Sequence, residues 1–246
     1  MSPGRATAPS ALDLPPPFRL LALREVEDAF AQAQRLAEQE GAGTMVHVER
    51  FDVAEFAVVL EPAEPLRTAR RAMYAGCAAL ADALAVFAPP ERPIEIAWPG
   101  AVRLDGGLVG GARLAWPRNA PENAPPAWLV FGAMIRTAAV GEAEPGLRPL
   151  AAALEEEGFA EVGDGRLVAC FARHLMAAID AWQNEGFGTV AKRYLARLAP
   201  ASGMQCSIDD NGDLLVARSG KVERRRLVPA LAKASWFDPV TRGPRR

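Results

Sequence analysis

Residues 94–111 have the sequence IEIAWPGAVRLDGGLVGG, and this stretch decides the predicted fold. Ile94 to Trp98 is typical of a strand, and Leu108 to Trp116 is typical of its partner strand. Asp105-Gly106-Gly107 lies between them and predicts a tight hairpin turn, because Asp-Gly pairs favour the positive φ angles that such turns need. The stretch therefore predicts antiparallel β-structure in the middle of the chain.

A helix, two strands and a longer helix precede this hairpin. Apolar residues recur at helical spacing over Glu25–Glu40. Met45–Arg50 alternates like a half-buried strand, and Phe56–Leu60 is a short apolar run typical of a more buried one. Leu66–Phe87 is dense in Ala and Leu, which predicts the longest helix, with small side chains that pack closely on a sheet.

After the hairpin the pattern changes from one more strand to helices and then to short strands. The strand is Ala127–Ile135, and the helices are expected at 147–158, Arg166–Glu185 and Val190–Leu198. The short strands, separated by tight turns, are Met204–Ile208, Asp213–Ala217 and Val222–Leu227. This order predicts one sheet with helices, mostly antiparallel by its connections, and a small β unit at the C-terminal end.

Composition limits the class of protein. The 246 residues carry a net charge of -2, whereas a nucleic-acid-binding protein needs a concentrated basic surface. No apolar stretch reaches the roughly 20 residues that cross a bilayer. Three widely separated cysteines, Cys77, Cys170 and Cys206, indicate reduced thiols and a cytoplasmic protein without disulfide or zinc site. Nucleic acid and membrane are therefore not expected partners.

Three segments resemble the biotin/lipoate protein ligase family. Ala97-Trp98-Pro99-Gly100, followed by Leu104 to Gly111, is similar to the family's lysine-tryptophan-proline-asparagine motif and to its hairpin that ends in a glycine pair. Trp128 to Ile135 is similar to the family's apolar strand with a glycine-rich, ligand-facing end. Asp209 to Val216 is similar to a hairpin of the family's C-terminal barrel.

The resemblance implies an α+β fold, with a mixed, mostly antiparallel sheet flanked by helices and a small SH3-like β-barrel at the C-terminus. It divides most of the chain into a biotin/lipoate protein ligase-like domain (18–200) and a small SH3-like β domain (201–236). The composition of the two ends predicts a flexible leader (1–17), rich in Pro, Ala and Ser, and an extended tail (237–246). The ligand-binding residues that it implies are Trp98, Pro99, Asp105, Gly110, Gly111, Gly132 and Arg136.

The family's reaction is the ATP-dependent attachment of biotin or lipoate to a lysine of a carrier protein. The resemblance therefore implies ATP and biotin or lipoate as ligands if that activity is retained. It implies a biotinyl or lipoyl carrier protein as a partner, and it allows a homodimer.

Several residues depart from the family's pattern. Leu108 stands where active members carry a lysine that supplies positive charge to the acyl-adenylate. The motif lysine and asparagine are Ala97 and Gly100, and the chain has no lysine before Lys192. Arg103 or Arg113 is an alternative source of positive charge.

The connection between the first two predicted strands is also too short for the loop that covers the adenylate in the family. Only residues 51–55 separate the first two strands, so this loop is expected to be deleted. Met134 and Arg136 take the places of a glycine and an asparagine, which would narrow or recharge the pocket.

Two hypotheses follow. One is a ligase-like protein whose activity is weak or lost; the other is a non-catalytic binding protein that recognises a carrier domain, an acyl group or a partner enzyme, because a shared fold does not transfer function. Structural roles are expected for the two histidines, His47 and His174. Asp209 to Asp213 is expected to be a hairpin turn and not a calcium loop, and no catalytic or metal-binding residue is predicted.

Overall fold

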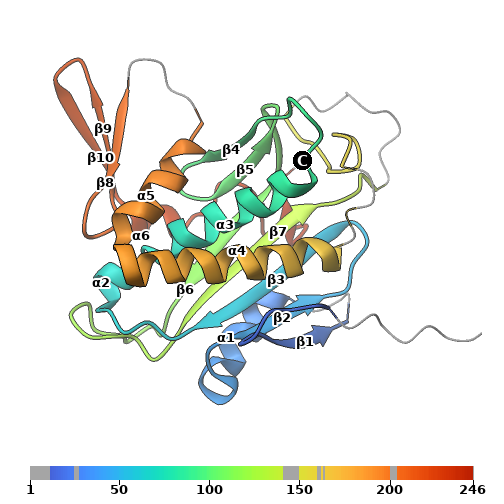
Figure 1. Ribbon diagram of the computed structural model, residues 1–246, viewed down its shortest axis with the longest axis horizontal. Coiled ribbons are helices and arrows are strands. Elements are labelled where there is room, and N and C mark those ends of the chain that lie inside the picture. The colour runs from blue at the N-terminus through green and yellow to red at the C-terminus, as the bar shows by residue number, and fades with distance from the viewer. Residues whose placement is uncertain are drawn as a thin grey trace, which may run out of the picture.

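The computed structural model describes residues 12–24, 28–140, 150–159, 162, 164–199 and 204–245. Its centre is a seven-stranded sheet of order β1-β2-β3-β7-β6-β5-β4 (Figure 1). The strands are β1 (Arg19–Leu23), β2 (Thr44–Val48), β3 (Val53–Leu60), β4 (Ile94–Ala97), β5 (Ala101–Leu104), β6 (Gly107–Ala115) and β7 (Leu129–Arg136). The β1–β2 pair is parallel and the other pairs are antiparallel. The predicted α+β class and mostly antiparallel sheet are confirmed.

Helices cover both faces of this sheet. They are α1 (Ala29–Glu40), α2 (Leu66–Ala69), α3 (Ala72–Phe87), α4 (Asp164–Glu185), α5 (Phe187–Ala196) and α6 (Leu227–Leu231). Because side chains alternate along a strand, Met45 and Phe56 pack with α3 and α4, whereas Val46 and Ala57 pack with α1 on the opposite face. Figure 1 shows α3 and α4 side by side in front of the sheet.

The small residues of α3 allow a close contact between this helix and the sheet. A Cβ atom added at Gly76 would lie 2.2 Å from the ring of Phe131 on β7. The Phe131 ring in turn stacks on Phe171 of α4, with 5.6 Å between the ring centroids. The absent side chain at Gly76 therefore sets the spacing between α3 and the sheet.

The structure differs from the sequence-based expectations in three places. The long helix is divided at Arg70 and Arg71, where bonds such as Arg71 N–H to Thr68 O, at 3.0 Å, tighten the turn between α2 and α3. The hairpin partner of β6 is β5, a strand that was not predicted, and β1 and α6 were also missed. Residues 150–158 form no helix; Leu108 N–H donates to Leu150 O (2.8 Å), so this segment runs along β6 instead.

The C-terminal β unit consists of two small sheets. The first contains β8 (Gln205–Ile208), β9 (Leu214–Arg218) and β10 (Lys221–Arg225); the second contains β11 (Phe237–Asp238) and β12 (Gly243–Pro244). The expected small β unit is present, but over residues 204–245 it does not close into a barrel. In the first sheet, β9 pairs with β8 on one side and with β10 on the other, and the edge strands β8 and β10 do not pair with each other.

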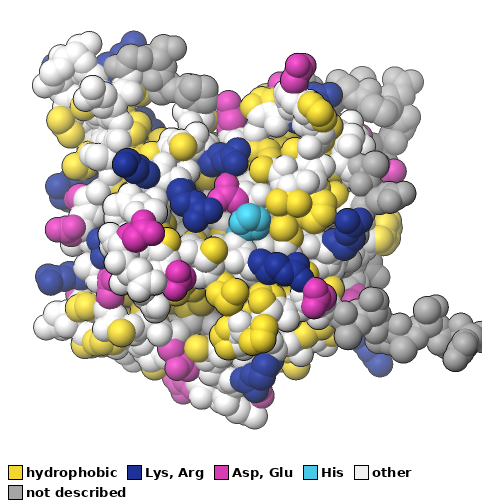
Figure 2. Space-filling view, in the orientation of Figure 1, with side chains coloured by type: hydrophobic (Ala, Val, Ile, Leu, Met, Phe, Trp, Pro, Cys, Tyr) yellow, Lys and Arg dark blue, Asp and Glu magenta, His cyan; other side chains and the backbone are white. Residues whose placement is uncertain are grey.

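Two further features bear on the expectations from composition. Basic and acidic side chains are interspersed over the face drawn in Figure 2. Within the described ranges, no helix has the length and apolar character that crossing a membrane requires.

Gly76→Ala should lower the free energy of unfolding by about 1–3 kcal/mol, because the added methyl group overpacks the contact with Phe131. Gly188→Ala is the matched control: Gly188 lies on α5, and an added Cβ meets nothing within 4 Å. That variant should gain up to about 1 kcal/mol from helix propensity. Urea titrations of both variants measure the difference, and equal effects would contradict this account of the packing.

Candidate ligand-binding surface

Two glycines leave space on the face of the sheet that also carries α1. Gly111 on β6 is opposite Met134, and Gly132 on β7 is opposite Arg113 in the same ladder. An added Cβ at Gly132 would lie 2.5 Å from the ring of Phe30, and one at Gly111 would lie 2.6 Å from the ring of Trp236. We call this face of β3, β6 and β7, marked by Gly111 and Gly132, the glycine surface.

Aromatic side chains from the two ends of the chain fill this surface. Trp236 is 2% exposed, and its indole Nε1–H donates to the carbonyl oxygen of Ala112 at 3.1 Å. It packs in one apolar cluster with Val53, Leu108 and Met134. Leu108, which stands in the place of the family's lysine, therefore belongs to the same apolar cluster as Trp236.

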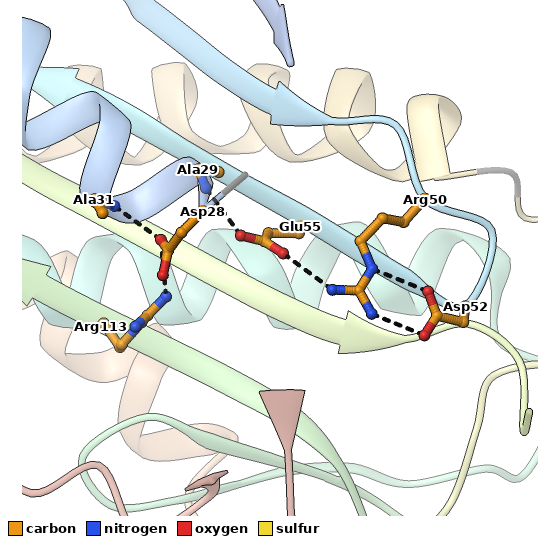
Figure 3. Close-up of polar contacts among 7 residues, drawn as sticks. All are labelled: Asp28, Ala29, Ala31, Arg50, Asp52, Glu55 and Arg113. Atoms are coloured by element: carbon orange, nitrogen blue, oxygen red, sulfur yellow. Dashed lines mark hydrogen bonds and ion pairs between the residues drawn. The ribbon is translucent and has the colours of Figure 1, made fainter. Parts of the chain in front are cut away.

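A network of charged side chains borders the aromatic rings (Figure 3). Asp28 caps α1 by accepting from Ala31 N–H at 2.8 Å, and its other contact is an ion pair with Arg113 at 3.7 Å. Glu55 on β3 accepts from Ala29 N–H at 2.9 Å and faces Arg50 at 3.6 Å. The start of α1 is thus held over the sheet by two carboxylates.

Arg113 lies next to both glycines: it is two residues after Gly111 on β6 and opposite Gly132 on β7. Its guanidinium lies between the rings of Phe30 and Phe237, at 4.4 and 4.5 Å from their centroids. Its Nε is buried without a hydrogen bond from the described residues. Sequence reasoning had named Arg113 as one alternative, and strand alternation from Gly111 would have selected it.

The electrostatics of the network follow from burial. Glu55 is 2% exposed, and this burial raises the pKa of its carboxyl group, against the opposing effects of Ala29 N–H and Arg50. Burial also lowers the pKa of the Arg113 guanidinium. At the rim, the hydrogen bond from Arg50 lowers the pKa of Asp52. The glycine surface therefore holds carboxylates and guanidinium groups that pair with one another and are largely shielded from water.

Arg136 lies at the end of β7 and contacts the C-terminal residues. Its Nη2 donates to the carbonyl oxygens of Pro244 and Arg245, at 2.9 and 3.1 Å, and its Nη1 donates to Ala152 O at 3.4 Å. Arg136 is 8% exposed. A predicted ligand-binding residue thus binds the chain's own backbone.

Trp98 and Pro99 face a different part of the molecule. Trp98 Nε1–H donates to Tyr74 Oη at 3.1 Å, and Tyr194 Oη donates to Pro99 O at 3.0 Å. Trp98 also borders a cavity of about 620 Å³ between β4, the end of α5 and the strands β8 and β9. Pro99, in contrast, reaches a small cavity beside Trp236.

The remaining predicted residues are not all brought together. Gly110 lies where β6 meets β7 so closely that an added Cβ would be 1.9 Å from Met134 O. Asp105 lies at the exposed β5–β6 turn and pairs with Arg92 at 2.8 Å, away from the glycine surface. Trp236, Glu55 and Asp28 were missed, because their proximity arises only from tertiary structure.

The comparisons with known proteins agree with this architecture. Residues 14–196 match the Biotin/lipoate A/B protein ligase family. A biotin protein ligase-like protein of unknown function from Silicibacter sp. TM1040 has 26% identity and a TM-score of 0.76, over 89% of this chain and 98% of that one.

More distant structures share the fold. The biotin protein ligase of Aquifex aeolicus has 14% identity and a TM-score of 0.65, over 85% of this chain and 95% of that one. The Leishmania major enzyme in complex with biotinyl-5-AMP has 15% identity and a TM-score of 0.54, over 85% and 98%. No curated protein sequence matches the chain.

Glu55→Gln tests the buried carboxylate. A raised folded-state pKa means that Glu55 favours the folded state most below its ordinary pKa of about 4.3, and that this contribution is lost as the pH rises through the folded-state value. Gln removes the ionisation and keeps an oxygen for Ala29 N–H. The free energy of unfolding of the wild type minus that of the variant should therefore fall as the pH rises above the ordinary pKa of a glutamate and through the raised folded-state value. A constant or rising difference in urea titrations would contradict the assignment.

Proposed function

We propose that this chain, which belongs to the biotin/lipoate A/B protein ligase family, binds a biotinyl or lipoyl carrier domain through its acyl arm without forming an acyl-adenylate. The observation that carries this proposal is the burial of Leu108 in one apolar cluster with Val53, Met134 and Trp236 on the glycine surface. An apolar pair occupies the region in which the resemblance places a cationic lysine.

The residues at this surface do not fit an acyl-adenylate. Stabilising the developing charge of phosphoryl and carboxyl groups needs preorganised cations. Arg113 is already paired with Asp28, and Arg50 binds Asp52 through two hydrogen bonds of 3.0 and 2.8 Å. The connection between β2 and β3 has only the four residues 49–52, which is too short for a loop that covers a nucleotide.

The same surface retains features suited to an apolar acyl group. Gly111 and Gly132 leave the strand backbone bare, and the rings of Trp236 and Phe30 lie over it. An apolar acyl group that displaced such a ring would have the same close approach to the backbone. The family's carrier proteins present such a group on a lysine arm, which makes a carrier domain the partner that we favour. The three free cysteines support a reducing, cytoplasmic location.

The proposal is tested with biotin, lipoate and octanoate, each with and without Mg-ATP, and with purified biotinyl and lipoyl carrier domains. We expect no pyrophosphate release and no thermal shift that requires both acid and ATP. Calorimetry should detect a carrier domain, with a preference for the acylated over the unmodified form. Pyrophosphate release that depends on one of the acids would overturn the proposal.

A second candidate function is a retained, slow ligase activity, and the position of Arg113 favours it. Arg113 is on the ladder position opposite Gly132, so it could supply the charge that Leu108 lacks. In that case Arg113→Met should abolish acid-dependent pyrophosphate release, whereas Arg113→Lys should retain part of it. Equal rates in the two variants would exclude this role.

A further inference from the structure

We infer that residues 232–245 are a displaceable internal occupant of the glycine surface, whose release uncovers a site for an acyl group that ends in a carbonyl or carboxylate. We call these residues the C-terminal strap. The identity of the ligand rests on the proposed function, but the opening of the strap does not.

The attachment of the strap favours local release. The β11 and β12 strands pair with each other, and the described backbone hydrogen bonds of residues 236–245, such as Arg245 N–H to Trp236 O at 2.7 Å, stay within the strap. Its hydrogen bonds to the sheet come from two side chains, Trp236 and Arg136. Release therefore breaks no strand ladder of the central sheet.

The groups of the strap indicate the chemistry of the ligand that would replace it. A planar apolar ring lies against Gly111 and donates one N–H to Ala112 O. Two carbonyl oxygens, from Pro244 and Arg245, accept from the Arg136 guanidinium. Free biotin, lipoate or octanoate offers the same pair of features, an apolar body and a terminal carboxylate that would accept from Arg136. In the acyl arm of a carrier, the amide carbonyl at the lysine would take the place of that carboxylate.

The turn of the strap is exposed and is held by a single carboxylate. Val240, at its tip, is 88% exposed. Asp238 accepts from Val240 N–H at 2.9 Å and from Thr241 Oγ1–H at 3.1 Å. Asp238 thus stabilises the strap without contact to the glycine surface, and it offers a way to weaken the strap alone.

Hydrogen exchange of the full chain, followed by mass spectrometry in low urea, tests the opening. The amides of Phe237–Arg245 should exchange about 100-fold or more faster than those of β3 and β7, with little dependence on urea, as expected for local opening. Exchange of the strap together with β7, at one common rate and urea dependence, would overturn the inference.

Two variants connect opening to binding. Arg136→Gln removes the bonds to Pro244 and Arg245, and Asp238→Ala removes the turn contacts, so each should raise strap exchange by about tenfold. Arg225→Gln is the matched control, since Arg225 donates to Glu223 Oε1 at 2.8 Å on the exposed strand β10 and should change neither quantity. Asp238→Ala keeps Arg136, the group proposed to bind the ligand, so this variant is the one used to measure ligand affinity.

Biotin, lipoate and octanoate are the probes. The affinity of Asp238→Ala for at least one of them should rise by the same factor as its strap opening, because only the open fraction binds. Unchanged affinity for all three, despite faster strap exchange, would overturn the inference. Loss of carrier-domain binding alone would contradict the proposed function and leave the strap mechanism intact.

Discussion

The absence of a side chain at Gly111 is the constraint on which the candidate site depends. Because β6 has no Cβ there, the ring of Trp236 reaches the strand backbone and bonds to Ala112 O at 3.1 Å. That ring completes the apolar cluster around Leu108 and places Phe237 over Arg113. The Arg113 guanidinium then lies between Phe237 and Phe30 and forms its ion pair with Asp28.

The buried charges illustrate why such a surface is stable without a ligand. A carboxylate in an apolar environment is costly unless it is hydrogen-bonded and paired. Glu55 meets that requirement through Ala29 N–H and Arg50, and Asp28 meets it through Ala31 N–H and Arg113. The helix α1 and the sheet thus neutralise each other's polar groups, so the surface needs no bound anion to fold.

Local signals in the sequence were sufficient for most of the central sheet. The Asp105-Gly106 turn and the apolar run 127–135 placed two strands of the central sheet, and the small residues of 66–87 indicated close helix packing. The strand β5 was missed because 101–104 is short and follows a proline and a glycine. The helix expected over 147–158 is absent from 150–158, where bonds to Leu108 replaced helical ones.

The position of the strap, far along the chain, has a consequence for the protein during synthesis. A chain leaves the ribosome from its N-terminus at about 5–20 residues per second, and its domains fold as they emerge. The strands β3, β6 and β7 therefore precede Trp236 by at least 100 residues. For some seconds a nascent chain therefore lacks the indole that covers Gly111, whereas Phe30, which covers Gly132, has already been synthesised.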